Sequence, residues 1–167
     1  MVNIFEKEII QKMKEYFGED KKRINHALQV TDYARTLIKN SWNQDLNPEV
    51  IIYAAILHDI GIKQAEEKYN STAGRFQEIE GPPIARRILN SFPISEEIIN
   101  EVCEIIAHHH SPGKIDTYNF KLLYDADWLV NLPAEYDLTA NRDKINNIID
   151  RLYLTEVGKE LASKLFN

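Results

Sequence analysis

An apolar run that ends in two strong metal ligands constrains this chain more than any other stretch. Residues 51–57 contain no charged side chain, and His58 and Asp59 follow them directly. Gly61 then closes the stretch. A run this apolar is typical of a buried segment, and a buried segment seldom carries that polar pair without a purpose. We therefore expect His58 and Asp59 to belong to a binding site.

The flanking residues indicate that the run is a helix. Asn47 is a typical N-cap and Pro48 suits the first helical position. Gly61 is expected to supply the left-handed residue after the last turn, which would place His58 and Asp59 in that turn. Unpaired carbonyls and the helix dipole favour a cation there.

Further segments show helical periodicity, and no segment shows the alternation typical of a strand. We expect Pro82 and Pro83 in the first turn of their helix, and Ser95 and Thr155 as N-caps. The expected fold class is all-α, a compact helical bundle. The expected helices cover residues 3–17, about 24–40, part of 63–75, about 82–89, 96–110, 118–132, 141–154 and 155–166.

Composition limits the class of protein. The 167 residues suit a single domain over 1–167, with a core motif region over about 21–132 and C-terminal helices over 141–166. The lone Cys103 is expected to be a buried apolar residue in a reducing compartment. No run is long enough to span a membrane and no signal peptide is visible, so a cytoplasmic location is expected. The net charge of −6, with both signs interspersed, argues against general nucleic-acid binding.

The histidines point to a transition metal. All five lie at the edge of an apolar helical stripe or at a helix end: His26, His58, His108, His109 and His110. Imidazoles mixed with carboxylates suit a divalent Mn, Fe, Co, Ni or Zn ion, whereas Mg or Ca sites are nearly all oxygen.

The order of these residues resembles the HD-domain superfamily of metal-dependent phosphohydrolases. The segments that carry the resemblance are Arg23–Val30, Leu57–Gly61 and Ala126–Leu129. The resemblance covers about residues 23–131. It implies a compact helical bundle that hydrolyses phosphate monoesters or diesters, often in nucleotides.

The resemblance also implies four ligands, His26, His58, Asp59 and Asp127. Asp125 is the rival for the last position, but carboxylates two residues apart on a helix point about 200° away from each other and cannot both reach one ion. Helical periodicity does not choose between them; the family pattern favours Asp127. We expect Asp125 to be a salt-bridge or capping partner.

A second ion could be held by His108, His109 or His110, as in some HD proteins. At most two of these successive side chains can face one site, and His109 is the first candidate. A cluster of histidines that caps the helix end is an equally open interpretation. Two-metal HD proteins usually carry another His in the following helix, where this chain has Gln77. One ion is therefore favoured.

Other polar residues are candidates for catalysis and substrate binding. Asp59, Glu66 and His109 are candidates to orient the attacking water. The substrate-binding candidates are Lys63, Gln77, Glu78, Arg86 and Arg87, for which a surface role is the alternative. Tyr124 and Trp128, four residues apart, are expected to serve packing rather than base stacking.

The sequence thus predicts a metal-dependent phosphohydrolase acting on a small phosphate ester such as a nucleotide. One alternative is a di-iron HD-type oxygenase; another is a catalytically weak, metal-bound sensing module. A homodimer is compatible with a helical domain of this size, although no diagnostic interface is visible.

Overall fold

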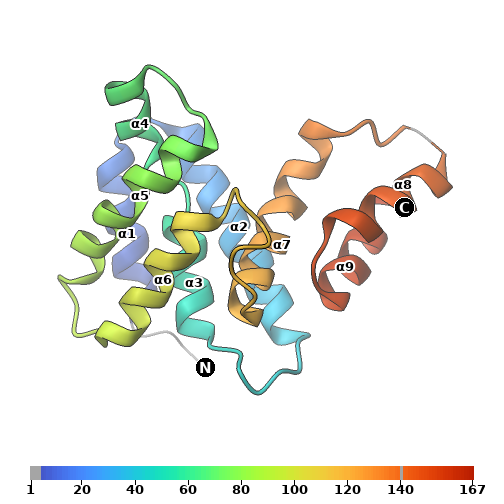
Figure 1. Cartoon of the computed structure of the whole chain (residues 1–167), viewed down its shortest axis with the longest axis horizontal. Helices are drawn as coiled ribbons and strands as arrows, with labels where there is room; N and C mark the ends of the chain where they lie inside the picture. The colour runs from blue at the N-terminus through green and yellow to red at the C-terminus, as the bar shows by residue number, and fades with distance from the viewer. Residues whose placement is uncertain (1–4, 140) are drawn as a thin grey trace.

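Residues 5–139 and 141–167, the part of the chain described by the computed structural model, form nine helices and no strand (Figure 1). This confirms the expected all-α fold. None of these helices is long and apolar enough to cross a membrane. The helices are α1 (Glu6–Phe17), α2 (Lys21–Lys39), α3 (Pro48–Leu57), α4 (Ile62–Tyr69), α5 (Gly74–Leu89), α6 (Glu96–His108), α7 (Tyr118–Glu135), α8 (Arg142–Leu152) and α9 (Glu156–Phe166).

Helix α3 is the centre of the core. It packs against α1, α2, α6 and α7, and every residue from Val50 to Leu57 is buried. The Asn47 side chain accepts hydrogen bonds from the N–H groups of Glu49 at 3.0 Å and Val50 at 3.4 Å. Pro48 follows in the first helical turn, so the expected start of the helix is confirmed. His58 and Asp59 are therefore attached to the most firmly packed helix of the molecule.

The end of α3 differs from the expectation. The helix ends at Leu57, and Gly61 has φ −80° and ψ −9° in the right-handed region. The prediction of a left-handed backbone at Gly61 is therefore wrong. The chain turns directly into α4 instead. Gly61 is needed for space, because a Cβ there would lie 2.5 Å from the Gly81 backbone nitrogen on α5. This close approach fixes α4 and α5 beside His58 and Asp59.

Helix α5 starts earlier than expected. It begins at Gly74, so Pro82 and Pro83 lie in its interior and their expected place in the first turn is wrong. Proline inside a helix removes backbone hydrogen bonds, a cost that packing must offset. The packing is dense here: α5 contacts both α4 and α6, and Gly81 is buried with no room for a Cβ beside Ile106. The buried Cys103 of α6 also donates to the Pro82 carbonyl at 3.6 Å.

The expected caps at the other helix starts are present. The Ser95 side chain accepts from the Ile98 N–H, and the Thr155 side chain accepts from the Gly158 N–H at 3.0 Å. Short polar side chains at these positions satisfy N–H groups that the helix itself leaves unpaired.

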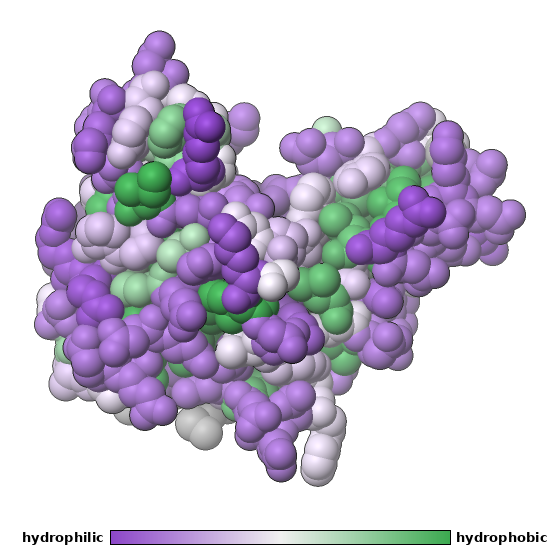
Figure 2. Space-filling model, in the orientation of Figure 1, coloured by the Kyte–Doolittle hydropathy of each residue, from purple (hydrophilic) through white to green (hydrophobic). Residues whose placement is uncertain are grey.

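Helices α8 and α9 form a pair that joins the rest of the molecule mainly through α7. Figure 1 shows this pair projecting from the larger group of helices, and Figure 2 shows hydrophobic side chains where the two parts meet. Asp125 of α7 anchors the pair: its carboxylate accepts from the N–H groups of Leu154 and Thr155 at 2.8 and 2.9 Å, and from the Thr155 hydroxyl at 2.6 Å. Burial raises the pKa of Asp125 to about 6. Asp125 is thus a capping partner.

Replacing Asp125 with alanine is expected to lower the free energy of unfolding by about 3 kcal/mol, because three donors, two of them buried, lose their acceptor. Thermal unfolding measures the loss, and hydrogen exchange is expected to rise first in residues 153–167. Asp116→Ala is the matched control, since Asp116 is exposed and forms an ion pair with the surface residue Lys121 at 2.9 Å. Equal stability of the two variants would contradict an anchoring role for Asp125.

Candidate metal centre

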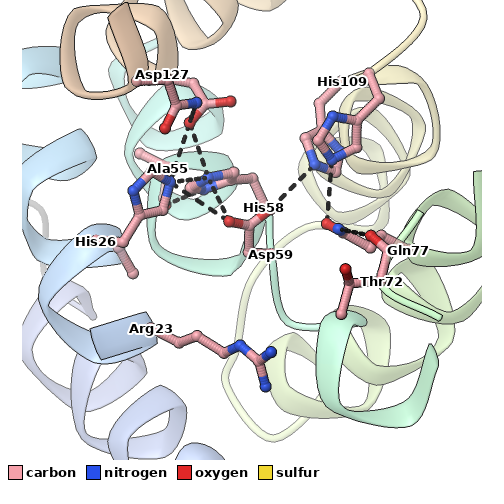
Figure 3. A network of polar contacts seen from close by, with 12 residues as sticks. Arg23, His26, Ala55, His58, Asp59, Thr72, Gln77, His109 and Asp127 are labelled. Atoms are coloured by element: carbon pink, nitrogen blue, oxygen red, sulfur yellow. Dashed lines mark hydrogen bonds and ion pairs between the residues drawn. The ribbon is translucent and has the colours of Figure 1, made fainter. Parts of the chain in front are cut away.

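Three helices bring the four implied ligands together, and we refer to His26, His58, Asp59 and Asp127 as the first ligand group (Figure 3). His26 comes from α2 and Asp127 from α7, while His58 and Asp59 follow α3. The His26 Nε2 atom lies 3.1 Å from Asp127 Oδ1, 3.3 Å from His58 Nε2 and 3.4 Å from Asp59 Oδ2. The His58 Nε2 atom lies 3.4 Å from both carboxylates. Two imidazole nitrogens and two carboxylate oxygens therefore face one point.

Backbone contacts orient two of the imidazoles. His58 Nδ1 lies 2.8 Å from the Ala55 carbonyl, and His109 Nδ1 lies 2.7 Å from the Ile106 carbonyl. A carbonyl can only accept, so each Nδ1 carries a proton in this contact and each Nε2 is the ring nitrogen that faces the ligand groups. Metal-binding histidines are commonly held in this way.

Charge in the group favours a cation. Burial alone would lower the pKa of His58, but the carboxylates of Asp59 and Asp127 outweigh it and raise that pKa well above its ordinary value. Burial alone would raise the pKa of Asp59 and of Asp127. His58 and His109 instead hold the pKa of Asp59 well below its ordinary value. His58 and His26 do the same for the pKa of Asp127. Two ionised carboxylates in a buried site need positive charge between them, from a proton or a metal ion.

Asp59, His109 and His110 form a second ligand group that shares Asp59 with the first. One ligand atom from each of the three lies within 4.8 Å of the others, and His109 Nε2 is 3.3 Å from Asp59 Oδ1. Asp59 therefore presents one oxygen to each group. His108 belongs to neither group, and its Nδ1 contacts the Glu104 carbonyl at 3.1 Å.

Gln77 completes the surroundings of the second ligand group. Its Oε1 atom lies 3.1 Å from His110 Nε2, and its Nε2 donates to the Thr72 carbonyl at 2.6 Å (Figure 3). The Thr72 contact fixes the orientation of the amide, so Oε1 is the atom turned toward the histidine. Gln77 thus offers the second ligand group a neutral amide oxygen and no imidazole.

Both groups have the chemistry of a site for a divalent transition metal. The first offers two nitrogens and two anionic oxygens, and Asn131 donates to Asp127 Oδ1 at 2.9 Å, which orients that carboxylate. Mixed imidazole and carboxylate donors with such supporting bonds suit Mn, Fe, Co, Ni or Zn. The second group offers fewer anionic atoms.

The first ligand group opens into a cleft of about 570 Å³. Arg23 lies at its rim on α2, one helical turn before His26, and its guanidinium makes a two-pronged ion pair with Glu66 of α4. Asp20 also contacts Arg23 at 3.1 Å. The lining residues are Asp20, Lys22, Arg23, His26, Asp59, Ile62, Thr72, Gln77, His110, Asp127, Asn131 and Glu135.

The other residues singled out from the sequence lie elsewhere. Lys63 donates to the Tyr16 carbonyl of α1 at 3.4 Å, and Arg86 binds Glu96 and Asn100 of α6. Neither they nor Arg87 line the cleft. Glu78 accepts from the His110 N–H at 3.3 Å and from the Ser111 hydroxyl at 2.9 Å, so it supports the segment that carries the second ligand group.

Arg23 and Asn131 are two residues of this cleft that sequence reasoning passed over. Both could have been found from helical spacing. Arg23 stands three residues before His26 and Asn131 four residues after Asp127, and residues three or four apart share one helix face.

Comparison with known proteins supports the resemblance. The family model described as HD domain matches residues 23–153, which is most of the chain. No curated protein and no solved structure matches. The matched range includes both ligand groups and the residues that line the cleft except Asp20 and Lys22. The chain therefore belongs to the HD domain family.

Proposed function

We propose that this chain is a metal-dependent phosphohydrolase that cleaves a small phosphate ester, of which a nucleotide is the favoured kind. The observation that carries the proposal is the convergence of His26, His58, Asp59 and Asp127 below a cleft with Arg23 at its rim. The proposal includes action in the cytoplasm on small phosphorylated substrates rather than on nucleic acid.

The first ligand group would hold one divalent ion. Such an ion lowers the pKa of a bound water and polarises the phosphoryl oxygens. The protein's part is to fix its ligands: α3 is buried along its length, the Ala55 carbonyl orients His58, and Asn131 orients Asp127. Ligands held in this way need little rearrangement when the reaction occurs.

The attacking water is expected to contact both Asp59 and His109. His109 is almost fully buried, and its Nε2 lies 3.3 Å from Asp59 Oδ1. A water placed there could pass a proton to His109 while Asp59 holds it in position. Glu66, the third candidate, is bound to Arg23, so its role in this proposal is to position that arginine.

Arg23 is proposed to bind the phosphate. Arg23→Gln is expected to raise KM by roughly 10- to 100-fold, since charge-assisted bonds contribute ~1.5–3 kcal/mol. Steady-state kinetics of phosphate release measure the change. Arg86→Gln is the matched control, because Arg86 pairs with α6 outside the cleft, and its kinetics are expected to stay close to those of the native protein. A larger rise in KM for Arg86→Gln than for Arg23→Gln would contradict this assignment.

Metal removal is expected to abolish phosphate release and to lower the unfolding temperature by roughly 5–10 °C, since an ion at 100 times its Kd contributes ~2.7 kcal/mol. The measurements are metal content, phosphate release from a nucleotide panel and a generic phosphodiester, and thermal unfolding. Adding Mn, Fe, Co, Ni or Zn back should restore activity with at least one metal. Full activity in metal-free protein would overturn the proposal.

The second ligand group is the observation that supports a di-iron oxygenase as the other candidate. Two irons per chain, with oxygen uptake and no phosphate release, would favour that function. One ion per chain with phosphate release would favour the hydrolase. We favour the hydrolase because this chain has Gln77 at the position where a histidine would be expected in a two-metal site.

A further inference from the structure

A side pocket of about 180 Å³ adjoins the cleft. The two hollows share His110, Asp127, Asn131 and Glu135, so one ligand can occupy both. Its lining residues are His109, His110, Pro112, Tyr124, Asp127, Trp128, Asn131 and Glu135. If one end of a ligand is held at the first ligand group, the rest of that ligand can therefore extend into this pocket.

One face of α7 supplies most of the side pocket. Tyr124, Asp127, Trp128, Asn131 and Glu135 follow one another at intervals of one, three or four residues, which places them along one stripe of a helix. The same stripe carries the metal ligand Asp127. The distance between the ligand group and the pocket is thus fixed by a single rigid helix.

The aromatic wall of the pocket is held in place. The Trp128 ring packs against the hydrophobic core, and its centroid lies 6.1 Å from that of the Tyr136 ring. The Trp128 carbonyl accepts from the Tyr153 hydroxyl at 2.9 Å, which fixes the backbone of the same residue. An indole held in this way presents a flat surface at little entropic cost, as aromatic binding residues commonly do.

The chemistry of the lining selects a neutral planar group. Among its described residues there is no Lys or Arg, and the carboxylate of Glu135 would repel a second phosphate. Asn131 gives one side-chain N–H to Asp127, and within the described part of the chain its amide oxygen and second N–H have no protein partner, so they are available to a ligand. Together with Glu135 it offers both donors and acceptors, which suits a ring with polar edges better than a plain hydrocarbon ring.

We propose that this side pocket binds the nucleobase of a nucleoside monophosphate, with Trp128 as its stacking surface. The proposal rests on the phosphohydrolase function for the place of the phosphate, at the first ligand group. Trp128 is then a specificity residue, and the packing role expected for it from the sequence is only part of its function.

Binding can be tested apart from hydrolysis. Trp42 and Trp128 are the two tryptophans, and Trp42 is fully exposed, so Trp42→Phe leaves Trp128 as the single fluorescent reporter. Adenosine, which has no phosphate to lose, is expected to quench this fluorescence to saturation, and ribose 5-phosphate is not. Absence of quenching by adenosine overturns the pocket, whether or not the protein releases phosphate.

Kinetics provide the second test. Trp128→Ala is expected to lower the ratio of kcat/KM for adenosine monophosphate over ribose 5-phosphate by about 5- to 150-fold, the range for loss of one base–aromatic stack. Trp128→Phe keeps a ring and should keep most of the ratio, and Trp42→Phe is the activity-neutral control. If all variants release phosphate with the same ratio of kcat/KM values, the nucleobase-pocket proposal is contradicted and the phosphohydrolase proposal is not. Adenosine quenching without any phosphate release supports the pocket and overturns the hydrolase.

Discussion

Replacing Asp59 with alanine is expected to reduce kcat/KM for phosphate release by roughly 1,000-fold or more, since loss of one preorganised contact already costs ~10²–10³. Asp59 is the one residue common to both ligand groups: its Oδ2 lies 3.4 Å from the Nε2 atoms of His26 and His58, and its Oδ1 lies 3.3 Å from that of His109. A single substitution thus removes an anionic ligand and the residue that positions the proposed water.

Metal content is the measurement that explains the loss. Asp59→Ala is expected to bind less than one ion per chain, because three ligands with a single negative charge remain where four ligands with two negative charges converged. Asp127→Ala removes a ligand from the first group alone, so it should lose the ion but leave the Asp59 and His109 pair intact. Asp116→Ala, on the surface, is the control for a missing carboxylate.

The result also separates an enzyme from a sensing module. A folded Asp59→Ala protein with undiminished phosphate release would contradict the proposed catalytic role of the site. If the native protein binds one ion tightly and cleaves no phosphate ester, the sensing module becomes the better description. Thermal unfolding of each variant shows whether a loss of activity reflects a loss of fold.

The features that could be predicted from the sequence are those decided locally. Asn47, Ser95 and Thr155 cap helices through bonds to N–H groups two or three residues away, so a short window of sequence contains both partners. The apolar stripes are equally local, and they were sufficient to predict an all-α fold.

The features that could not be predicted depend on distant neighbours. Gly61 looked like a helix terminator, but its role is set by Gly81, twenty residues later on another helix. Pro82 and Pro83 looked like a helix start, but packing of α5 against α6 keeps the helix continuous through them. Local propensity is only a weak guide where tertiary packing opposes it.

The candidate site shows the same division. The four ligands implied by the family resemblance lie together, although helical periodicity alone did not choose between Asp125 and Asp127. The long charged side chains do not follow from spacing: Arg86 finds partners on α6, and Glu66 finds Arg23 on α2. Flexible side chains of this kind choose among several neighbours after the helices have packed, so sequence alone does not identify their partners.

Replacing Gln77 with histidine is expected to create a tight second metal site. Gln77 Oε1 lies 3.1 Å from His110 Nε2, so an imidazole at position 77 would add a nitrogen to Asp59, His109 and His110. Imidazole suits first-row transition metals better than a neutral amide oxygen does. The affinity for a second ion should rise by at least the roughly 10- to 100-fold that changes around a metal site typically produce.

Metal titration of the two proteins measures this difference. The native chain is expected to reach one tightly bound ion, and the Gln77→His chain two, with Gln77→Asn as the control that keeps an amide. The first ion should be unaffected, since Gln77 contacts neither His26, His58 nor Asp127 and is tied to Thr72. Two tight ions in the native chain would contradict this prediction: the amide oxygen would then be an adequate ligand, and the second group would have to enter the mechanism as a second metal site.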